Sequence, residues 1–455
     1  MTTATHTTAP PTDEVYAQHV NPQWVRLLNA LQMSAPYTRC TRAELETADG
    51  RVVLDFLSGY CVHNAGHNHP VVVAALQEEL ARSGPAMLQS HVPQLAGALA
   101  SALCHRAGGG LTKAFFASSG SEGVEAAIKF ARAHTRRDGL LYAHGAFHGL
   151  TCGALSLMGD PFWRTGFGPL LPGCEAVPFG QLPELEERLA TKRFAAFIGE
   201  PVQAEAGIVI PSPDYWQAVQ SLCRRYGTLL VFDEVQTGLY RTGPFLAAHR
   251  FDVEPDMVVL AKALSGGLVP SAAVLFGDGI YNSVYGSLKR AIIHTSTYGE
   301  NALAMRAGLA TLDALESAGL GERGLAMGEL LRRELRSALG GFEMVKDIRG
   351  VGLLNGIEFT APRKLLLRAP FEAFMAIHPG MFGQIVVMRL FRDHNILTQI
   401  CGNNFLVLKA APPLVVSETQ VERFVSALRS VVELMHTSPA FWTEALALAR
   451  RVANV

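Results

Sequence analysis

The sequence predicts an α/β protein with a large domain, in which helices flank a mostly parallel sheet, and a smaller α+β domain from both termini. From residue 113 to about 275, apolar segments of strand length alternate with helical patterns. Such alternation is typical of a parallel sheet covered by helices on both faces. From about residue 320 the pattern changes to a long helix followed by strand-like segments. The chain of 455 residues is long enough for both domains.

The first 65 residues are expected to hold a tail and one part of the smaller domain. Residues 1–11 are rich in Thr and Pro and lack the pattern of a signal peptide, so we predict a disordered tail over residues 1–20. Residues 21–65 then form the N-terminal part of the small domain. Within them, residues 42–56 resemble a β-hairpin whose turn is Asp49-Gly50.

The large domain is expected to span residues 66–319 and the C-terminal part of the small domain residues 320–455. A helix over 71–80 follows Pro70, and a long helix covers about 302–317. Between them we predict strands over 114–117, 140–142, 194–198, 229–232 and 257–260, and helices over 122–136 and 215–226. Beyond residue 320 we predict a helix over 320–339 and strand-like segments over 345–359 and 396–408.

The composition argues against nucleic-acid and membrane partners. The net charge of −1 gives no general attraction to a phosphate backbone or an anionic lipid surface. No apolar run reaches about 18 residues, so we expect no transmembrane helix. The seven cysteines are scattered and include no Cys-x-x-Cys pair, which favours a reduced, cytoplasmic protein.

Two apolar runs each end in one charged residue. Residues 229–232 are followed by Asp233, and residues 257–261 are followed by Lys262. In open α/β sheets, ligands bind outside the carboxyl ends of the strands. An amine and a carboxylate placed there suit pyridoxal phosphate (PLP), because the amine forms the Schiff base and the carboxylate keeps the pyridine nitrogen protonated. A buried lysine is costly unless it is neutral or covalently used, so a catalytic role of Lys262 is favoured over a structural one.

Two glycine-containing segments are candidates for cofactor contacts. Gly120 and Ser121 lie where a predicted strand passes into a helix, so backbone N–H groups there could hold a phosphate. An ordinary capped turn explains the same residues. Phe147, followed by His148 and Gly149, could stack on a planar ring or belong to the core.

Metal binding is considered and disfavoured. Cys61, His63, His67 and His69 are the densest set of possible ligands, but no second cluster follows, and a buried polar turn is the better explanation. His144 and His148 have the spacing of a zinc motif without its glutamate. We therefore predict no metal site. Glu200 and Glu205 also follow a predicted strand, where they could be structural or could face a substrate amine or an arginine.

Taken together, these segments resemble the class III aminotransferases, also called ω-transaminases, which are PLP-dependent enzymes of fold type I. The resemblance covers about residues 54–417 and follows the order of the family's motifs. The matching motifs are Gly66-His67-Asn68-His69-Pro70, Ser119-Gly120-Ser121-Glu122, Phe147-His148-Gly149, Glu200-Pro201-Val202-Gln203, Glu205-Ala206-Gly207, Phe232-Asp233-Glu234-Val235-Gln236-Thr237-Gly238, the segment 256–262, Thr297-Tyr298-Gly299-Glu300-Asn301 and Pro412-Pro413-Leu414.

The resemblance implies a role for each matching residue. Lys262 would form the Schiff base and Asp233 would pair with the pyridine nitrogen. The remaining cofactor contacts would come from Gly120 and Ser121 at the phosphate, Phe147 and Val235 on the two ring faces, Gln236 at the ring hydroxyl, and His148. Thr297 would reach the phosphate of a neighbouring subunit, so the resemblance implies a homodimer with shared active sites. Tyr60, Glu200, Glu205 and Lys409 are the candidates for substrate contacts.

Two positions depart from the family's pattern. The family usually has Gly where Glu300 stands, and often has a carboxylate-binding Arg where Lys409 stands. Lysine cannot supply the planar fork that matches a carboxylate, although the partner glutamate of the family's switch is present as Glu205. We therefore expect an acceptor that lacks an α-carboxylate, such as an aldehyde or a long-chain ketone.

The expected function is PLP-dependent transfer of an amino group from an amine or amino acid donor to an aldehyde, ketone or keto acid. The same fold and cofactor also serve aminomutases, racemases and decarboxylases, and these alternatives stay open. A regulatory binding protein without activity is disfavoured, because Lys262 and Asp233 are both present.

Overall fold

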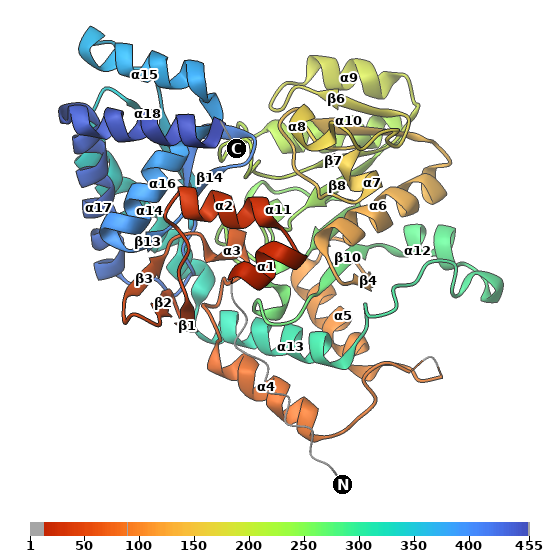
Figure 1. Cartoon of the computed structure of the whole chain (residues 1–455). Coiled ribbons are helices and arrows are strands. Elements are labelled where there is room, and N and C mark those ends of the chain that lie inside the picture. Colours follow the sequence, from red (N-terminus) through yellow and green to blue (C-terminus); the bar gives the residue numbers. More distant parts are fainter. Residues whose placement is uncertain (1–12, 89, 454–455) are drawn as a thin grey trace.

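The computed structural model describes residues 13–88 and 90–453, and its centre is a seven-stranded sheet (Figure 1). The strand order is β4-β10-β9-β8-β7-β5-β6. β10 is antiparallel to both of its neighbours, whereas β9, β8, β7, β5 and β6 pair in parallel. The strands are β4 (Lys113–Ala117), β5 (Gly139–Ala143), β6 (Cys174–Val177), β7 (Phe194–Gly199), β8 (Leu229–Asp233), β9 (Met257–Leu260) and β10 (Ala272–Phe276).

Both faces of this sheet are covered, which explains its uninterrupted apolar strands. In β8 and β9, Leu230, Phe232, Val258 and Leu260 belong to one core cluster, and the residues between them belong to a second cluster. Successive side chains of a strand point to opposite faces, so the two clusters mark the two faces of the sheet. Helix α6 (Gly120–Thr135) contributes to one cluster and α10 (Tyr215–Tyr226) to the other.

Helix α13 (Ala302–Ser317) packs on α4 (Pro70–Ala81) and α5 (Gln94–Ala107), and is followed by the C-terminal elements (Figure 1). These include a four-stranded antiparallel sheet with the order β11-β12-β15-β14. Its strands are β11 (Val345–Val351), β12 (Leu354–Phe359), β14 (Gln399–Cys401) and β15 (Asn404–Ala410). Helices α14 (Leu320–Leu339) and α16 (Phe382–His394) pack on these strands, α17 (Glu418–Thr437) packs on those two helices, and α15 (Leu365–Ile377) packs on α18 (Pro439–Ala453).

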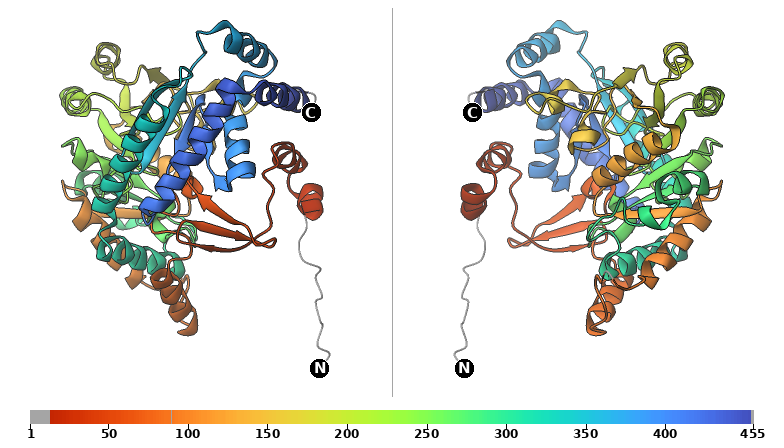
Figure 2. Two further views of the ribbon diagram at one scale, coloured as in Figure 1. Left: turned by 90° about the vertical axis from the view of Figure 1, so that its left-hand side faces the viewer. Right: turned by 90° about the vertical axis from the view of Figure 1, so that its right-hand side faces the viewer.

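Three strands from the N-terminal part of the chain and one strand from the C-terminal part form a third sheet, with the order β1-β2-β3-β13. The predicted hairpin is present as β2 (Glu44–Thr47) and β3 (Val52–Asp55), and Gly50 in its turn has φ +82°. β13 (Ile396–Leu397) pairs in parallel with β3, and β1 (Tyr37–Thr41) forms the opposite edge. Figure 2 shows these red N-terminal strands beside the blue C-terminal elements.

Several elements differ from the sequence-based expectation. Residues 1–12 of the predicted tail lie outside the described residues, but Asp13–His19 form helix α1 instead of continuing a disordered tail. Acidic residues in its first turn favour the helix, and Asn21 caps the following helix, α2 (Pro22–Ala30). The strand-like segment 396–408 divides into β13, β14 and β15, because a turn at residues 402–403 reverses the chain.

The remaining elements are short or lie at the edges of the sheets. They are α3 (Ser58–Cys61), α7 (Cys152–Leu155), α8 (Pro161–Arg164), α9 (Pro183–Ala190), α11 (Ala247–Arg250), α12 (Asp278–Tyr285) and the 3-10 turns Lys262–Ser265, Leu288–Arg290 and Pro379–Met381. Among residues 13–88 and 90–453, no single helix is long and apolar enough to cross a membrane, and only α15 joined to Pro379–His394, bent by 112°, meets the length and composition criteria as a pair.

Candidate active site

Asp233 and Lys262 lie at one cavity because their strands are parallel neighbours. Asp233, the last residue of β8, is in register with Val259 of β9, and Lys262 follows the end of β9. The cavity at this edge of the sheet has a volume of about 580 Å³, within the range of cofactor sites. Its lining includes Gly120, Ser121, Phe147, His148, Glu200, Asp233, Val235, Gln236 and Lys262.

Lys262 lines the cavity and has an unusual backbone conformation. Its φ is +48°, in the left-handed region that residues other than glycine rarely adopt. Burial lowers the pKa of Lys262, because an ammonium is poorly stabilised away from water. A larger fraction of the neutral amine is therefore present at neutral pH, and the neutral amine is the nucleophilic form.

Asp233 is buried and has a specific partner for its charge. Its Oδ2 lies 2.8 Å from Nδ1 of His148, and its Oδ1 accepts a hydrogen bond from the N–H of Val235 at 3.1 Å. Burial opposes protonation of His148, but the hydrogen bond to Asp233 and the charge of Asp233 outweigh it and raise the His148 pKa. The imidazole therefore holds the carboxylate in a fixed orientation at the cavity.

The N-terminus of α6 provides a concave surface with free backbone donors. Ser119 caps the 16-residue helix by accepting from the N–H of Glu122 at 3.2 Å. A Cβ added to Gly120 would lie 3.0 Å from Cγ2 of Val235, so a larger residue there would require the Val235 side chain to shift by a few tenths of an ångström. Ser121 Oγ lies 2.7 Å from the hydroxyl of Thr151. The helix dipole and these small residues suit a phosphate group.

Gln236 supplies a hydrogen-bond acceptor that the protein itself does not use. Its Nε2 donates to Oε1 of Glu205 at 3.0 Å. Its Oε1 is buried and has no hydrogen-bond partner among the described residues. Because buried polar atoms are normally paired, an acceptor at the cavity wall indicates a ligand with a hydroxyl or N–H group. Together with the amine, the carboxylate and the helix N-terminus, this donor set fits PLP.

The family model for aminotransferase class-III matches residues 28–432. The chain is 35% identical over 453 residues to aminotransferase PigE from a Serratia species, covering 93% of this chain and 53% of PigE. It therefore spans about half the length of that relative. It is also 34% identical to putrescine aminotransferase from Pectobacterium atrosepticum, covering 92% of this chain and 88% of that protein.

The chain belongs to the class III aminotransferases.

Solved structures of this family share the fold. Ornithine aminotransferase from Toxoplasma gondii matches with a TM-score of 0.80 at 26% identity, covering 94% of this chain and 99% of that chain. A PLP-bound amine transaminase from an uncultivated Pseudomonas species matches with a TM-score of 0.78 at 27% identity, covering 88% of this chain and 95% of that chain. The predicted resemblance, the fold type I architecture and the PLP cofactor are confirmed, and the enzyme catalyses PLP-dependent transamination between amine and carbonyl substrates.

Glu200 lines the cavity of this aminotransferase as a buried acid. Its carboxylate accepts hydrogen bonds from the N–H groups of Phe147 at 3.0 Å and Ala204 at 3.2 Å. Burial and, to a smaller extent, the negative charge of Asp233 raise the pKa of Glu200 to about 7, although His148 and the two N–H donors oppose this shift. The hydrogen bond from the N–H of Phe147 fixes the backbone at this residue, and the hydrogen bond from Ala204 orients the Glu200 carboxylate.

Glu205 and Lys409 form a buried ion pair next to the cavity. Lys409, on β15, is fully buried, and its Nζ donates to Oε1 of Glu205. The N–H of Gly402 donates to the other carboxylate oxygen at 2.8 Å. Burial alone would raise the pKa of Glu205, but the charge of Lys409 and these hydrogen bonds lower it to about 2. Neither residue lines the cofactor cavity directly, and Gln236 connects the pair to it.

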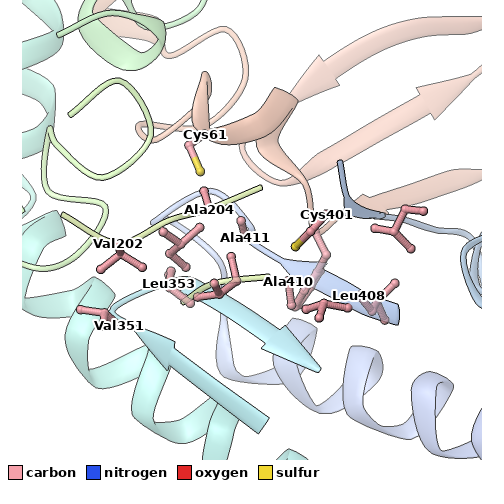
Figure 3. Packing of buried hydrophobic residues seen from close by; sticks show 14 of the residues in the cluster. Cys61, Val202, Ala204, Val351, Leu353, Cys401, Leu408, Ala410 and Ala411 are labelled. Atoms are coloured by element: carbon pink, nitrogen blue, oxygen red, sulfur yellow. The ribbon is translucent and has the colours of Figure 1, made fainter. Parts of the chain in front are cut away.

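Apolar residues surround the backbone at this ion pair. Figure 3 shows Ala204, Cys401 and Ala410, which are sequence neighbours of Glu205, Gly402 and Lys409, packed in one buried cluster. The low polarity of these neighbours explains the large effect of burial on the two charged groups. Because each charge is costly without the other, the pair is expected to stay closed unless a substrate supplies a replacement charge.

Tyr60 lies over this pair on a strained turn. Ser58, Gly59, Tyr60 and Cys61 all have positive φ, between 48° and 70°. The Nζ of Lys409 lies 5.1 Å from the centre of the Tyr60 ring, within the range of a cation–π contact. Three non-glycine residues with left-handed backbone within four positions are rare, and such strained segments are found mainly at functional sites. Burial raises the pKa of the Tyr60 phenol.

The other residues singled out from the sequence lie elsewhere. Thr297 is exposed and does not line the cavity of its own chain. His67 Nε2 lies 2.7 Å from Oδ2 of Asp55, and His63 stacks on His67 with a centroid separation of 3.8 Å. Among the residues that the structure describes, no group of three or more His, Cys, Asp or Glu side chains could hold a metal ion.

Sequence reasoning overlooked part of the cavity wall and one supporting contact. The loop after Lys262, including Leu268 and Ser271, lines the cavity, and its nearness to Lys262 in the sequence was the available signal. Trp163 contacts the ring of Phe147 edge-to-face at 5.5 Å. No motif marks Trp163, because its contacts join segments far apart in the chain.

Proposed function

We propose that this aminotransferase moves an amino group from a primary amine to an aldehyde or ketone that lacks an α-carboxylate. The observation that carries the proposal is the closed Lys409–Glu205 pair, in which lysine stands where the family often has arginine. A single ammonium attracts a carboxylate as a point charge but does not match its planar geometry. The similarity to a putrescine aminotransferase and to an amine transaminase supports an amine donor without a carboxylate.

The proposed chemistry assigns the central roles to Lys262 and Asp233. PLP supplies an aldehyde that bonds covalently to amines and a ring that takes up electrons from the substrate carbon. Lys262 Nζ holds the cofactor between turnovers, and once released it removes and returns a proton at the substrate carbon. Asp233, oriented by His148, keeps a proton on the ring nitrogen.

The cavity walls hold the cofactor in place in this proposal. Gly120 and Ser121 bind the phosphate through backbone N–H groups and the hydroxyl. Phe147 and Val235 enclose the ring, and the unpaired Oε1 of Gln236 accepts from the ring hydroxyl. On the substrate side, Tyr60 and Glu200 limit the space, and the Lys409–Glu205 pair is the charged boundary.

A homodimer with shared sites is also proposed. Exposed apolar side chains flank Thr297, including Leu288, Ile292 and Tyr298, of which Leu288 is 97% exposed. An apolar surface of this kind is typical of a protein–protein interface. A second copy packed there would bring Thr297 to the partner's phosphate site. The seven free cysteines fit a reduced, cytoplasmic enzyme, and we place the domain boundaries near residues 66 and 319.

The acceptor preference tests the proposed substrate class. We expect the wild-type holoenzyme to show a higher kcat/KM with hexanal than with 2-oxoglutarate. Lys409→Arg restores a planar fork and should raise kcat/KM for 2-oxoglutarate by up to about tenfold, which corresponds to 1.4 kcal/mol. Lys113→Arg, at an exposed lysine on β4, is the matched control and should change neither value. A wild type that prefers 2-oxoglutarate would contradict the proposal.

A further inference from the structure

Trp163 joins two parts of the molecule that are distant in sequence. It lies on the short helix α8, beside the central sheet, and its indole Nε1 donates a hydrogen bond to Oδ1 of Asn403 at 2.8 Å. Asn403 lies in the turn between β14 and β15 of the antiparallel sheet, 240 residues later. The hydrogen bond therefore links the segment between β5 and β6 to the C-terminal sheet.

Asn403 uses its remaining polar groups to bind two active-site loops. Its Nδ2 donates to the carbonyl of Gly145 at 2.9 Å, two residues before Phe147. Its backbone N–H donates to the carbonyl of Glu205 at 2.9 Å. One side chain and one N–H thus contact Trp163, the loop that carries Phe147 and the loop that carries Glu205.

The indole ring completes this arrangement through direct packing. Its plane is at 90° to the ring of Phe147, with 5.5 Å between centroids, which is a favourable edge-to-face geometry. A Cβ added to Gly402 would lie 3.5 Å from Cζ2 of Trp163 and 3.2 Å from Oε2 of Glu205. The ring therefore stands close to both the aromatic wall of the cofactor cavity and the carboxylate of the ion pair.

We propose that Trp163 and Asn403 are positioning residues that hold the Phe147 ring and the Glu205 carboxylate in one fixed relative placement. Phe147 borders the cofactor and Glu205 borders the substrate, so this placement aligns the substrate with the cofactor ring. The proposal rests on the proposed roles of those two residues. Small displacements of such walls reduce the rate of chemistry much more than they reduce binding.

Two substitutions remove this contact. Trp163→Phe keeps an aromatic ring beside Phe147 and loses the N–H, and Asn403→Ala removes the side-chain hydrogen bonds to Trp163, Gly145 and Ala146. Trp24→Phe is the matched control, because Trp24 is a partly exposed tryptophan on α2. Asn403→Asp keeps the acceptor for Trp163 and loses the donor to Gly145, so it separates the two functions of the side chain.

The experiment measures the visible circular dichroism of the bound cofactor and the rate of the amine half-reaction in single turnover. We expect Trp163→Phe and Asn403→Ala each to change the dichroism and to lower the half-reaction rate by about 2- to 12-fold, the range for loss of one hydrogen bond. The donor KM should change less than the rate. The double variant should be no slower than Asn403→Ala, because the two residues act through one contact.

Two outcomes would overturn the proposal. One is unchanged dichroism with half-reaction rates within twofold of the wild type in both single variants. The other is a double variant whose fold-reduction in the half-reaction rate equals the product of the two single fold-reductions, which is the result for two independent residues. The proposed function fails in a different way, since a wild-type holoenzyme that does not react with any amine would refute transamination, and the dichroism of the variants would still report the position of the cofactor.

Discussion

Replacing Lys409 by methionine tests whether the buried ion pair stabilises the enzyme. Methionine approximates the length of lysine but removes its charge, so Lys409→Met leaves the Glu205 carboxylate buried with only the donors of Gln236 and Gly402. The Glu205 pKa of about 2 lies about 2.5 below its ordinary value of 4.5, which corresponds to about 3 kcal/mol. Removal of one partner from a buried pair costs about 3–5 kcal/mol in other proteins, in agreement with this value.

The loss should depend on pH in a defined direction. In the wild type the depressed pKa of Glu205 contributes stability that is present above about pH 4.5 and is lost only as the pH falls through about 2. In Lys409→Met, burial without a compensating ammonium should raise the Glu205 pKa above its ordinary value. As the pH falls from 8 to 5, the folded variant then binds a proton at Glu205 that the unfolded chain does not bind. The difference in Tm between Lys409→Met and the wild type should therefore become smaller over this fall in pH.

Thermal unfolding of the holoenzyme measures the effect. An unfolding entropy of about 2.1 cal/mol/K per residue gives about 1 kcal/mol/K for 455 residues, so a loss of about 3–5 kcal/mol lowers Tm by about 3–5 °C. Lys346→Met is the control, because Lys346 is an exposed lysine and its partner on the neighbouring strand, Glu358, keeps a second ion pair with Arg349. Exposed pairs contribute at most about 1 kcal/mol, so its Tm should change by about 1 °C or less.

The double variant Lys409→Met/Glu205→Gln separates charge from packing. The amide removes the unpaired charge and keeps one of the two acceptor oxygens, for either Gln236 or Gly402, so part of the lost Tm should return. The reasoning is refuted if Lys409→Met unfolds at the same temperature as Lys346→Met, or if its deficit grows as the pH falls.

Three further substitutions test the cofactor site. Lys262→Ala should abolish turnover while PLP still binds noncovalently, and borohydride reduction of the wild type should label the peptide that contains Lys262; a label on another lysine would contradict the assignment. Asp233→Asn should keep the fold but slow proton transfer by roughly two or more orders of magnitude in single turnover, because the ring nitrogen loses its charge partner; a rate close to that of the wild type would exclude this role. Thr297→Ala should weaken PLP retention by roughly 10- to 150-fold, the range for one charge-assisted hydrogen bond, and mixed dimers should show the loss in the partner's site; a fully active monomer at high dilution would rule out shared sites.

The sequence predicted the central sheet and its charged ends because these signals are local. The apolar runs before Asp233 and Lys262 have the length and composition of buried strands, and the structure has β8 and β9 there. The reversed direction of β10 was not predicted, since Ala272–Phe276 is as apolar as the parallel strands beside it. Direction depends on the path of the connecting loop, which the composition of the strand does not encode.

Long-range contacts account for the parts of the site that the sequence did not reveal. Trp163 and Asn403 lie in segments without a motif, and their importance follows only from the hydrogen bond between them. The helix at Asp13–His19 was overlooked for a different reason, because the Thr- and Pro-rich composition of the first residues was extended to residue 20. Local composition predicts an element well only where neighbouring segments do not decide its structure.

The charges around the cavity explain why Asp233, and not Glu200, suits the ring nitrogen. Both carboxylates are buried, and His148 contacts Asp233 at 2.8 Å. Burial raises the pKa of Glu200 to about 7, so this acid holds its negative charge less firmly than an ordinary glutamate does. A carboxyl group with a raised pKa is a weaker charge partner for a protonated pyridine nitrogen. Asp233 has the raised-pKa imidazole of His148 as a partner for its charge, and β8 places it at the cavity. The electrostatics of the buried groups therefore support the proposed role of Asp233 independently of any sequence motif.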